Sequence, residues 1–104
     1  MNKTVENIQE WFKGKGLDKE DSKAQFGKLL EEVEELGEAL AESDLNHITE
    51  ELADVVIVTI GIALQQGIDF KQALAKGYEK ISKRKGIVKN GTFIKAEDLK
   101  GETE

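Results

Sequence analysis

Two pairs of acidic residues are the part of this sequence whose types and spacing could do chemistry. Glu32 and Glu35 are three residues apart, and so are Glu51 and Asp54. On an α-helix this spacing puts both side chains of a pair on one face, about one turn apart. Two such pairs facing each other would place four carboxylates around one point. Carboxylate oxygens suit a hard divalent cation, so the sequence predicts a site for Mg²⁺, with Mn²⁺ as a substitute.

Asp54 is the acid that is hardest to explain as part of a solvated surface. It lies in the apolar run from Leu52 to Leu64, so we expect its carboxylate to be buried. Burying a lone carboxylate is costly unless it is neutralised, paired or bound to a metal. A lysine from another helix is one structural alternative. Glu51 lies one turn away and adds repulsion, and a bound cation would remove both penalties.

The histidine and cysteine content narrows the kind of metal site. The chain has no cysteine, which excludes disulfides, thiolate ligands and a thiol nucleophile. His47 is its only histidine, and we expect this residue on a helix surface rather than among the ligands. Di-iron carboxylate bundles use Glu-x-x-His pairs on two helices, and no such pair exists in this sequence. A redox di-iron centre is therefore disfavoured.

The elements that must position these acids are helices. Apolar periodicity and capping signals predict four of them, at about Val5–Lys13, Ser22–Glu42, Leu45–Gln66 and Phe70–Lys85. Ser22 and Gln25 form a capping box for the second helix, and Asp44 is placed to cap the third. The turn between these two helices is short, so we expect them to pack antiparallel, with the two acid pairs at nearly the same level.

The C-terminal part should differ in structure. Asn90-Gly91 stands between two β-prone triplets, which predicts a β-hairpin over residues 87–94. The last ten residues are polar, and we expect them to be irregular. The fold class expected is all-α, a four-helix bundle protomer with a short C-terminal hairpin, forming one domain over residues 1–104.

The third predicted helix is apolar nearly all round beyond Glu51. A helix that is apolar on every side must be buried on every side. A chain of this size covers one or two of those sides, so we expect a second copy to cover the rest. The sequence therefore predicts a homo-oligomer, a dimer or a tetramer.

Charge and hydropathy exclude several classes of protein. Residues 1–68 hold 6 basic and 15 acidic residues, whereas residues 69–100 hold 9 basic and 4 acidic residues. The acidic bulk argues against a nucleic-acid-binding protein. The longest apolar run is too short to span a bilayer, and the first residues lack the apolar core of a signal peptide. We expect a cytoplasmic protein with no membrane partner.

The acidic motifs resemble those of the all-α nucleoside triphosphate pyrophosphohydrolases, which include MazG proteins, dimeric dUTPases and phosphoribosyl-ATP pyrophosphohydrolases. That signature is Glu-Glu-x-x-Glu followed by Glu-x-x-Asp. Here it reads Glu31-Glu32-Val33-Glu34-Glu35 and Glu51-Leu52-Ala53-Asp54. The resemblance extends over roughly residues 5–98, and two separated motifs agree in residue type, order and helical phase.

The resemblance implies Mg²⁺-dependent cleavage of a nucleoside triphosphate between its α- and β-phosphates. At the matching positions Glu32, Glu35, Glu51 and Asp54 would bind the metal. Glu31 would be an outer-shell acid or a base that orients the attacking water, and Glu31 and Glu35 are the catalytic candidates.

Six residues are candidates for binding the substrate. Lys28 lies on the same helical stripe as Glu32, so it is a candidate to bind phosphates. Gln25 borders that stripe, and Trp11 could stack on a base or simply anchor the first helix to the core. Further phosphate candidates cluster at the end of the fourth predicted helix, namely Lys80, Lys83 and Arg84.

Two other functions remain open at this point. The chain could be a non-catalytic helical interaction module whose acids only solvate its surface. It could also be a pyrophosphohydrolase that acts on a phosphoribosyl-nucleotide.

Overall fold

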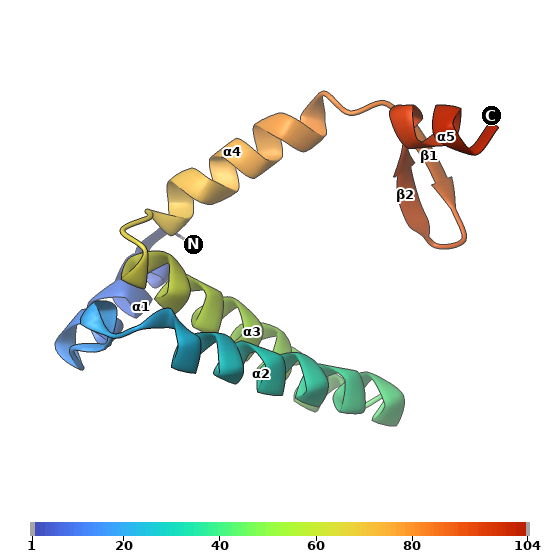
Figure 1. Cartoon of the computed structure of the whole chain (residues 1–104). Helices are drawn as coiled ribbons and strands as arrows, with labels where there is room; N and C mark the ends of the chain where they lie inside the picture. The colour runs from blue at the N-terminus through green and yellow to red at the C-terminus, as the bar shows by residue number, and fades with distance from the viewer. Residues whose placement is uncertain (1, 104) are drawn as a thin grey trace. The chain divides into compact units, whose positions relative to one another are not determined.

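The computed structural model describes residues 2–103, which are mainly helical (Figure 1). The chain divides into two units, Met1–Gln72 and Ala73–Glu104. In chain order its elements are α1 (Asn2–Gly14), the 3₁₀-helix η1 (Leu17–Lys19), α2 (Ser22–Glu42), α3 (Leu45–Gln65), α4 (Phe70–Ser82), β1 (Gly86–Lys89), β2 (Thr92–Lys95) and α5 (Ala96–Thr103).

In the first unit, α2 and α3 form an antiparallel helical hairpin, as the short turn predicts (Figure 1). Ser43 ends α2 in the left-handed conformation, with φ of 56°. Asp44 begins α3, and its carboxylate accepts hydrogen bonds from the backbone N–H groups of Asn46 at 3.1 Å and His47 at 3.3 Å. The predicted cap at Asp44 is therefore confirmed.

The start of α2 differs from the predicted capping box. The cap is Asp21, whose carboxylate accepts a hydrogen bond from the backbone N–H of Lys23 at 2.7 Å. Asp21 takes this role because it has the extended backbone of a cap, whereas Ser22 is already the first helical residue. The Ser22 hydroxyl instead accepts a hydrogen bond from Gln66 Nε2 at 2.8 Å, which ties the start of α2 to the end of α3.

Close packing of α1 on α3 sets the position of the first helix. Phe12 is 3% exposed, and its ring lies against the backbone of α3 at Gly61. A Cβ at Gly61 would lie 2.6 Å from Phe12 Cε1 and 2.9 Å from Gln25 Nε2, so only glycine permits this approach. The connector after α1 is held as well, because Gln65 Nε2 donates to the carbonyl of Leu17 at 3.0 Å.

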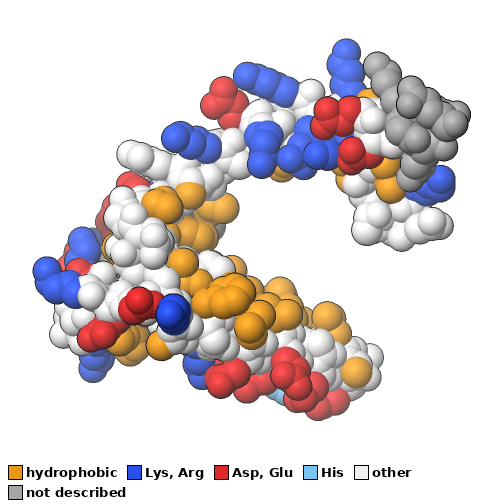
Figure 2. Space-filling model, in the orientation of Figure 1, with side chains coloured by type: hydrophobic (Ala, Val, Ile, Leu, Met, Phe, Trp, Pro, Cys, Tyr) orange, Lys and Arg blue, Asp and Glu red, His pale blue; other side chains and the backbone are white. Residues whose placement is uncertain are grey.

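Helical periodicity also predicts one apolar stripe along α2, formed by Phe26, Leu29, Leu30, Val33, Leu36 and Leu40. In the structure this stripe does not face the core as a whole. Ala39 is fully buried, and Leu29 and Leu36 are half-buried. The rest of the stripe is about half exposed, namely Phe26, Leu30, Val33 and Leu40. On α3, Leu52 and Val56 are similarly exposed, while Ile60 is fully buried. Hydrophobic side chains gather along one edge of the α2–α3 hairpin and acidic ones along the opposite edge (Figure 2). The first unit thus leaves an apolar face uncovered.

The second unit contains most of α4, the hairpin and α5. Helix α4 ends at Ser82 rather than at the predicted Lys85. It ends early because the N–H groups of Lys83 and Arg84 bond to carbonyls three residues back, which tightens the last turn. The hairpin is confirmed, with Ile87 paired with Ile94 and Val88 with Phe93.

The predicted irregular C-terminus is wrong, because α5 follows β2 directly. Its first turn contains Glu97 and Asp98, whose negative charges stabilise the N-terminus of a helix. None of the described helices is long and apolar enough to cross a membrane.

Candidate metal centre

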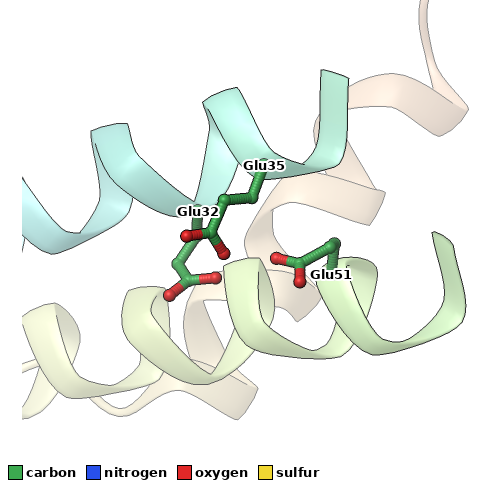
Figure 3. Close-up of side chains that lie close together, drawn as sticks. All are labelled: Glu32, Glu35 and Glu51. Carbon is green, nitrogen blue, oxygen red and sulfur yellow. The ribbon is translucent and has the colours of Figure 1, made fainter. Parts of the chain in front are cut away.

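Three carboxylates from two facing helices meet in the first unit. Glu32 and Glu35 project from α2, and Glu51 projects from α3 (Figure 3). One carboxylate oxygen from each of the three residues lies within 4.8 Å of the other two. The spacing of three residues puts Glu32 and Glu35 on one side of α2, and the tight turn at Ser43 and Asp44 brings Glu51 opposite them.

The burial of two of these acids makes the cluster unlike a solvated surface. Glu32 is 4% exposed and Glu51 is 7% exposed, whereas Glu35 is exposed to solvent. In the described part of the chain, Oε2 of Glu32 and Oε2 of Glu51 are buried and have no hydrogen-bond partner. Buried polar atoms in native proteins are nearly always paired, so these two oxygens are accounted for if they bind a ligand.

The protonation of Glu51 reflects this crowding. Burial raises the pKa of Glu51 from its ordinary 4.5 to about 7, and the close approach and negative charge of Glu32 and Glu35 add to the shift. A carboxyl group with this pKa is partly protonated at neutral pH without a cation. Binding a cation would remove the repulsion and favour the ionised form.

Asp54, the fourth predicted ligand, is not part of the three-residue group. Asp54 is only half-buried, although its apolar neighbours led us to expect a buried side chain. Glu51 is the more deeply buried acid of this pair. Asp54 lies one turn beyond Glu51 on α3 and lines a cavity together with Glu32. Its role as a ligand stays a prediction.

Beside the cluster lies a cavity of about 540 Å³. Among the residues that line it are three predicted substrate-binding residues, Trp11, Gln25 and Lys28, and two predicted ligands, Glu32 and Asp54. Its size falls within the range of about 300–1,000 Å³ typical of small-molecule sites. The Trp11 ring packs edge-on against Phe12, with the ring centroids 5.3 Å apart, and Trp11 is 54% exposed.

Lys28 lies at the boundary between this cavity and the acids. Its Nζ is 3.2 Å from Glu32 Oε1 and 3.7 Å from Glu31 Oε2. Hydrogen bonding to Glu32 raises the pKa of Lys28 above its ordinary value of 10.5, which further favours the charged ammonium form. Glu31, the catalytic candidate beside Glu32, is exposed. It contacts Lys28, which in turn contacts Glu32 of the cluster.

The remaining phosphate candidates belong to the second unit and are described apart from the cluster. Lys80, Lys83 and Arg84 are exposed, and Lys83 Nζ lies 3.3 Å from Glu79 Oε1. A small cavity of about 270 Å³ in this unit is lined in part by Lys83, Arg84 and Lys95. The phosphate-binding role of these residues stays a prediction.

The sequence predicts His47 on a helix surface rather than among the metal ligands. The structure places its Nε2 3.5 Å from Glu51 Oε1 and its Nδ1 3.3 Å from Glu42 Oε2. Hydrogen bonding to Glu42 raises the pKa of His47. The signal was present in the sequence, because His47 precedes Glu51 by four residues and shares its face of the helix.

The donor atoms of the cluster fit a divalent cation. All three residues offer carboxylate oxygens, which hard cations prefer, and Glu32 and Glu51 each have one buried oxygen that lacks a partner. The arrangement can therefore hold a divalent metal ion beside a cavity large enough for a small molecule. The identity of the ion does not follow from these contacts.

Comparisons with known proteins agree with this chemistry. The family profile of the MazG nucleotide pyrophosphohydrolase domain matches residues 21–88, which is more than half of the chain. The match covers α2, α3 and α4, and so all three carboxylates of the cluster. Searches of curated proteins and of solved structures gave no significant match. The chain belongs to the family of MazG nucleotide pyrophosphohydrolase domains.

Proposed function

We propose that this protein is a Mg²⁺-dependent nucleoside triphosphate pyrophosphohydrolase. It adds water across the bond between the α- and β-phosphates of a (d)NTP and releases a nucleoside monophosphate and pyrophosphate. Mn²⁺ is expected to replace Mg²⁺ because both are hard cations that oxygen ligands accept.

One observation carries this proposal. Oε2 of Glu32 and Oε2 of Glu51 are buried without a partner, in a cluster that adjoins a cavity containing a cationic side chain. An interaction module whose acids only solvate its surface would have no need of buried, unpaired carboxylate oxygens. A metal site beside a phosphate-binding cavity explains both features.

In this proposal Glu32, Glu35 and Glu51 hold the cation, and Asp54 completes the ligand set from the cavity side. A bound divalent cation supplies neutralisation of the triphosphate and activation of the attacking water. The three acids must be ionised together, which the raised pKa of Glu51 opposes until the cation binds.

The residues around the cluster bind and orient the substrate. Lys28 turns from Glu32 toward a phosphate oxygen, which its exposed side chain permits. Glu31 and Glu35 are the proposed groups that orient water or accept its proton, which their exposure to solvent permits. Trp11, at the cavity wall, offers an aromatic face to the base, and Gln25 offers an amide.

A second copy of the chain is proposed to cover the apolar face of the first unit. This face consists of the exposed side chains of Phe26, Leu30, Val33, Leu40, Leu52 and Val56. Exposed apolar patches of this kind mark association surfaces. In the proposed homo-oligomer, a dimer or a tetramer, these helices complete a four-helix bundle. Lys80, Lys83 and Arg84 of the second unit remain proposed phosphate-binding residues. We place the enzyme in the cytoplasm.

A panel of (d)NTPs tests the function directly. Each nucleotide is incubated with the purified protein and Mg²⁺, and pyrophosphate and orthophosphate are measured separately. We expect pyrophosphate to form with at least one nucleotide, to require Mg²⁺ and to stop with EDTA. Adding phosphoribosyl-ATP to the panel tests the alternative substrate class, the phosphoribosyl-nucleotides.

Matched variants link this activity to the cluster. Glu51→Gln removes the buried acid, whereas Glu50→Gln makes the same change at the exposed residue beside it. Turnover should be lost in the first variant and kept in the second. No pyrophosphate from any nucleotide, with folded protein and Mg²⁺ present, would contradict the proposed function.

A further inference from the structure

The two buried acids of the cluster share one local arrangement. Each has a cationic or imidazole side chain four residues before it on the same helix, Lys28 before Glu32 and His47 before Glu51. In both cases the neighbour lies against Oε1, at 3.2 Å and 3.5 Å respectively, while Oε2 is buried without a partner. The neighbour thus engages one oxygen of each carboxylate and leaves the other for a ligand.

The two neighbours differ in how firmly they are held. Lys28 has a flexible stem and lines the cavity, so it is free to move to an anion there. His47 has a rigid ring that is engaged on both sides, by Glu42 at Nδ1 and by Glu51 at Nε2. Glu42 is the last residue of α2, so the imidazole links the end of α2 to the acid on α3. Asp44 also accepts from the backbone N–H of His47, which fixes the first turn of α3.

From this geometry we propose that His47 is a positioning residue for Glu51, holding Oε1 so that the buried Oε2 stays available to a cation shared with Glu32 and Glu35. The proposal rests on the metal site of the proposed function, in which Glu51 is a ligand. His47 does not join the ligand set; it acts through Glu51. Outer partners of this kind orient the ligands of metal sites, and their removal lowers metal affinity about 10- to 100-fold.

Rescue by amide side chains separates this role from a merely structural one. A glutamine places its amide nitrogen near the position of His Nε2, and an asparagine places its amide nitrogen near the position of His Nδ1. His47→Gln therefore keeps a donor facing Glu51, whereas His47→Asn keeps a donor facing Glu42. His47→Ala removes both contacts. The three variants differ in which acid is still contacted.

The test is the affinity of the metal-free protein for Mn²⁺ alone, measured by calorimetric titration of the wild type and the three variants. We expect His47→Ala and His47→Asn to weaken Mn²⁺ binding about 10-fold or more. His47→Gln should stay within about threefold of the wild type. The melting temperatures of the four metal-free proteins report any general loss of structure, and we expect them to be similar because His47 is about a third exposed.

The other outcomes are informative as well. If His47→Ala binds Mn²⁺ as tightly as the wild type or more tightly, or if glutamine fails to restore affinity, His47 does not position Glu51. The proposed function survives that result, because the wild type still binds the metal. If the wild type itself binds no Mn²⁺, the metal site fails and this inference falls with it.

Discussion

Lys28 Nζ lies 3.2 Å from Glu32 Oε1, one helical turn away on α2. Glu32 is buried and Lys28 is half exposed at the cavity, so the ion pair joins the candidate metal centre to the space where a substrate would bind. Glu32 raises the pKa of Lys28 above its ordinary value of 10.5, so the ion pair favours the ammonium form that is already charged at neutral pH. The Lys28 ammonium group can reach either Glu32 or a phosphate in the cavity. Substitution of Lys28 is therefore a specific test of substrate binding.

Lys28→Gln should raise KM for the nucleotide about 10-fold or more, because a hydrogen bond to a charged group is lost at the phosphates. Steady-state pyrophosphate release at saturating Mg²⁺ measures this effect. Lys23→Gln changes another lysine on α2 that does not line the cavity, and it should leave KM unchanged. Equal kcat/KM values for Lys28→Gln and the wild type would remove Lys28 from the substrate site.

Metal affinity should depend on pH through Glu51. Its pKa of about 7 means that below pH 7 a proton must leave before a cation binds. The charged and titratable groups that face Glu51 are Glu32, Glu35 and His47. We expect affinity for Mn²⁺ to rise up to about 10-fold per pH unit below pH 7 and to level off above pH 8. Titrations from pH 6 to 8.5, in two buffers of different ionisation enthalpy, measure both the affinity and the protons released. An affinity for Mn²⁺ that does not change with pH would contradict this coupling to Glu51.

The metal-free protein should show the opposite trend in stability. The pKa of Glu51 in the folded state, about 7, lies above its ordinary value of 4.5, so protonation favours folding. This contribution is fully present below pH 4.5 and is lost as the pH rises through 7. Thermal melts of the wild type and Glu51→Gln in EDTA should therefore diverge with rising pH, with the glutamine variant gaining relative stability. Parallel curves would show that Glu51 is not buried with a raised pKa.

Gly61 gives a prediction about packing with an internal control. In Gly61→Ala the new Cβ would lie 2.6 Å from the Phe12 ring, so α1 must shift, and we expect a loss of about 1–3 kcal/mol. Gly27 lies on an exposed part of α2 with no atom near a new Cβ. Gly27→Ala should instead stabilise the protein by about 0.5–1 kcal/mol, because alanine favours helix. Urea unfolding of both variants measures the change in the free energy of unfolding. Changes of the same sign in the two variants would contradict the packing of α1 on α3.

The single tryptophan of the chain provides a probe of substrate binding. Trp11 lines the cavity, so a bound nucleotide with Mg²⁺ should quench or shift its fluorescence. If the ring stacks on the base, Trp11→Ala should raise KM about fivefold or more, whereas Trp11→Phe should retain most of the affinity. Unchanged fluorescence at saturating nucleotide would place the base elsewhere.

The exposed apolar face predicts association between copies of the chain. Leu30 is 55% exposed in the first unit, and a charge at its position would be buried in an interface. Leu30→Glu should therefore shift the protein toward a monomer of 11.5 kDa in light scattering coupled to size exclusion. Leu30→Met keeps the surface apolar and should keep the assembly. A wild type that is monomeric at micromolar concentration would contradict the proposed oligomer.

Much of the site could be predicted from the sequence because it depends on local helix geometry. The spacing of Glu32 and Glu35, together with the tight turn at Asp44, was enough to bring Glu51 opposite them. The different environments of Glu51 and Asp54 could not be predicted, because they depend on the exact phase of α3 against α2. A one-residue error in that phase rotates a side chain by about 100°.

Other features depend on contacts that a single sequence does not specify. Which half of the α2 stripe is buried depends on the neighbours of α2, so the exposure of Phe26 and Leu30 was not foreseen. The contact between His47 and Glu51 was overlooked because a lone histidine on a polar helical turn is usually solvated. The helix α5 was missed because its polar composition was read as irregular, although Glu97 and Asp98 favour a helix start.

The position of a bound cation would show whether Glu32, Glu35 and Glu51 form a metal site. Crystals of the protein grown with Mn²⁺ allow the metal to be located by its anomalous scattering. We expect a peak between the carboxylates of Glu32, Glu35 and Glu51, at a distance of about 2.0–2.6 Å from their oxygens, the range of hard cations with oxygen ligands. A well-ordered structure in which these three side chains surround no anomalous peak would contradict it.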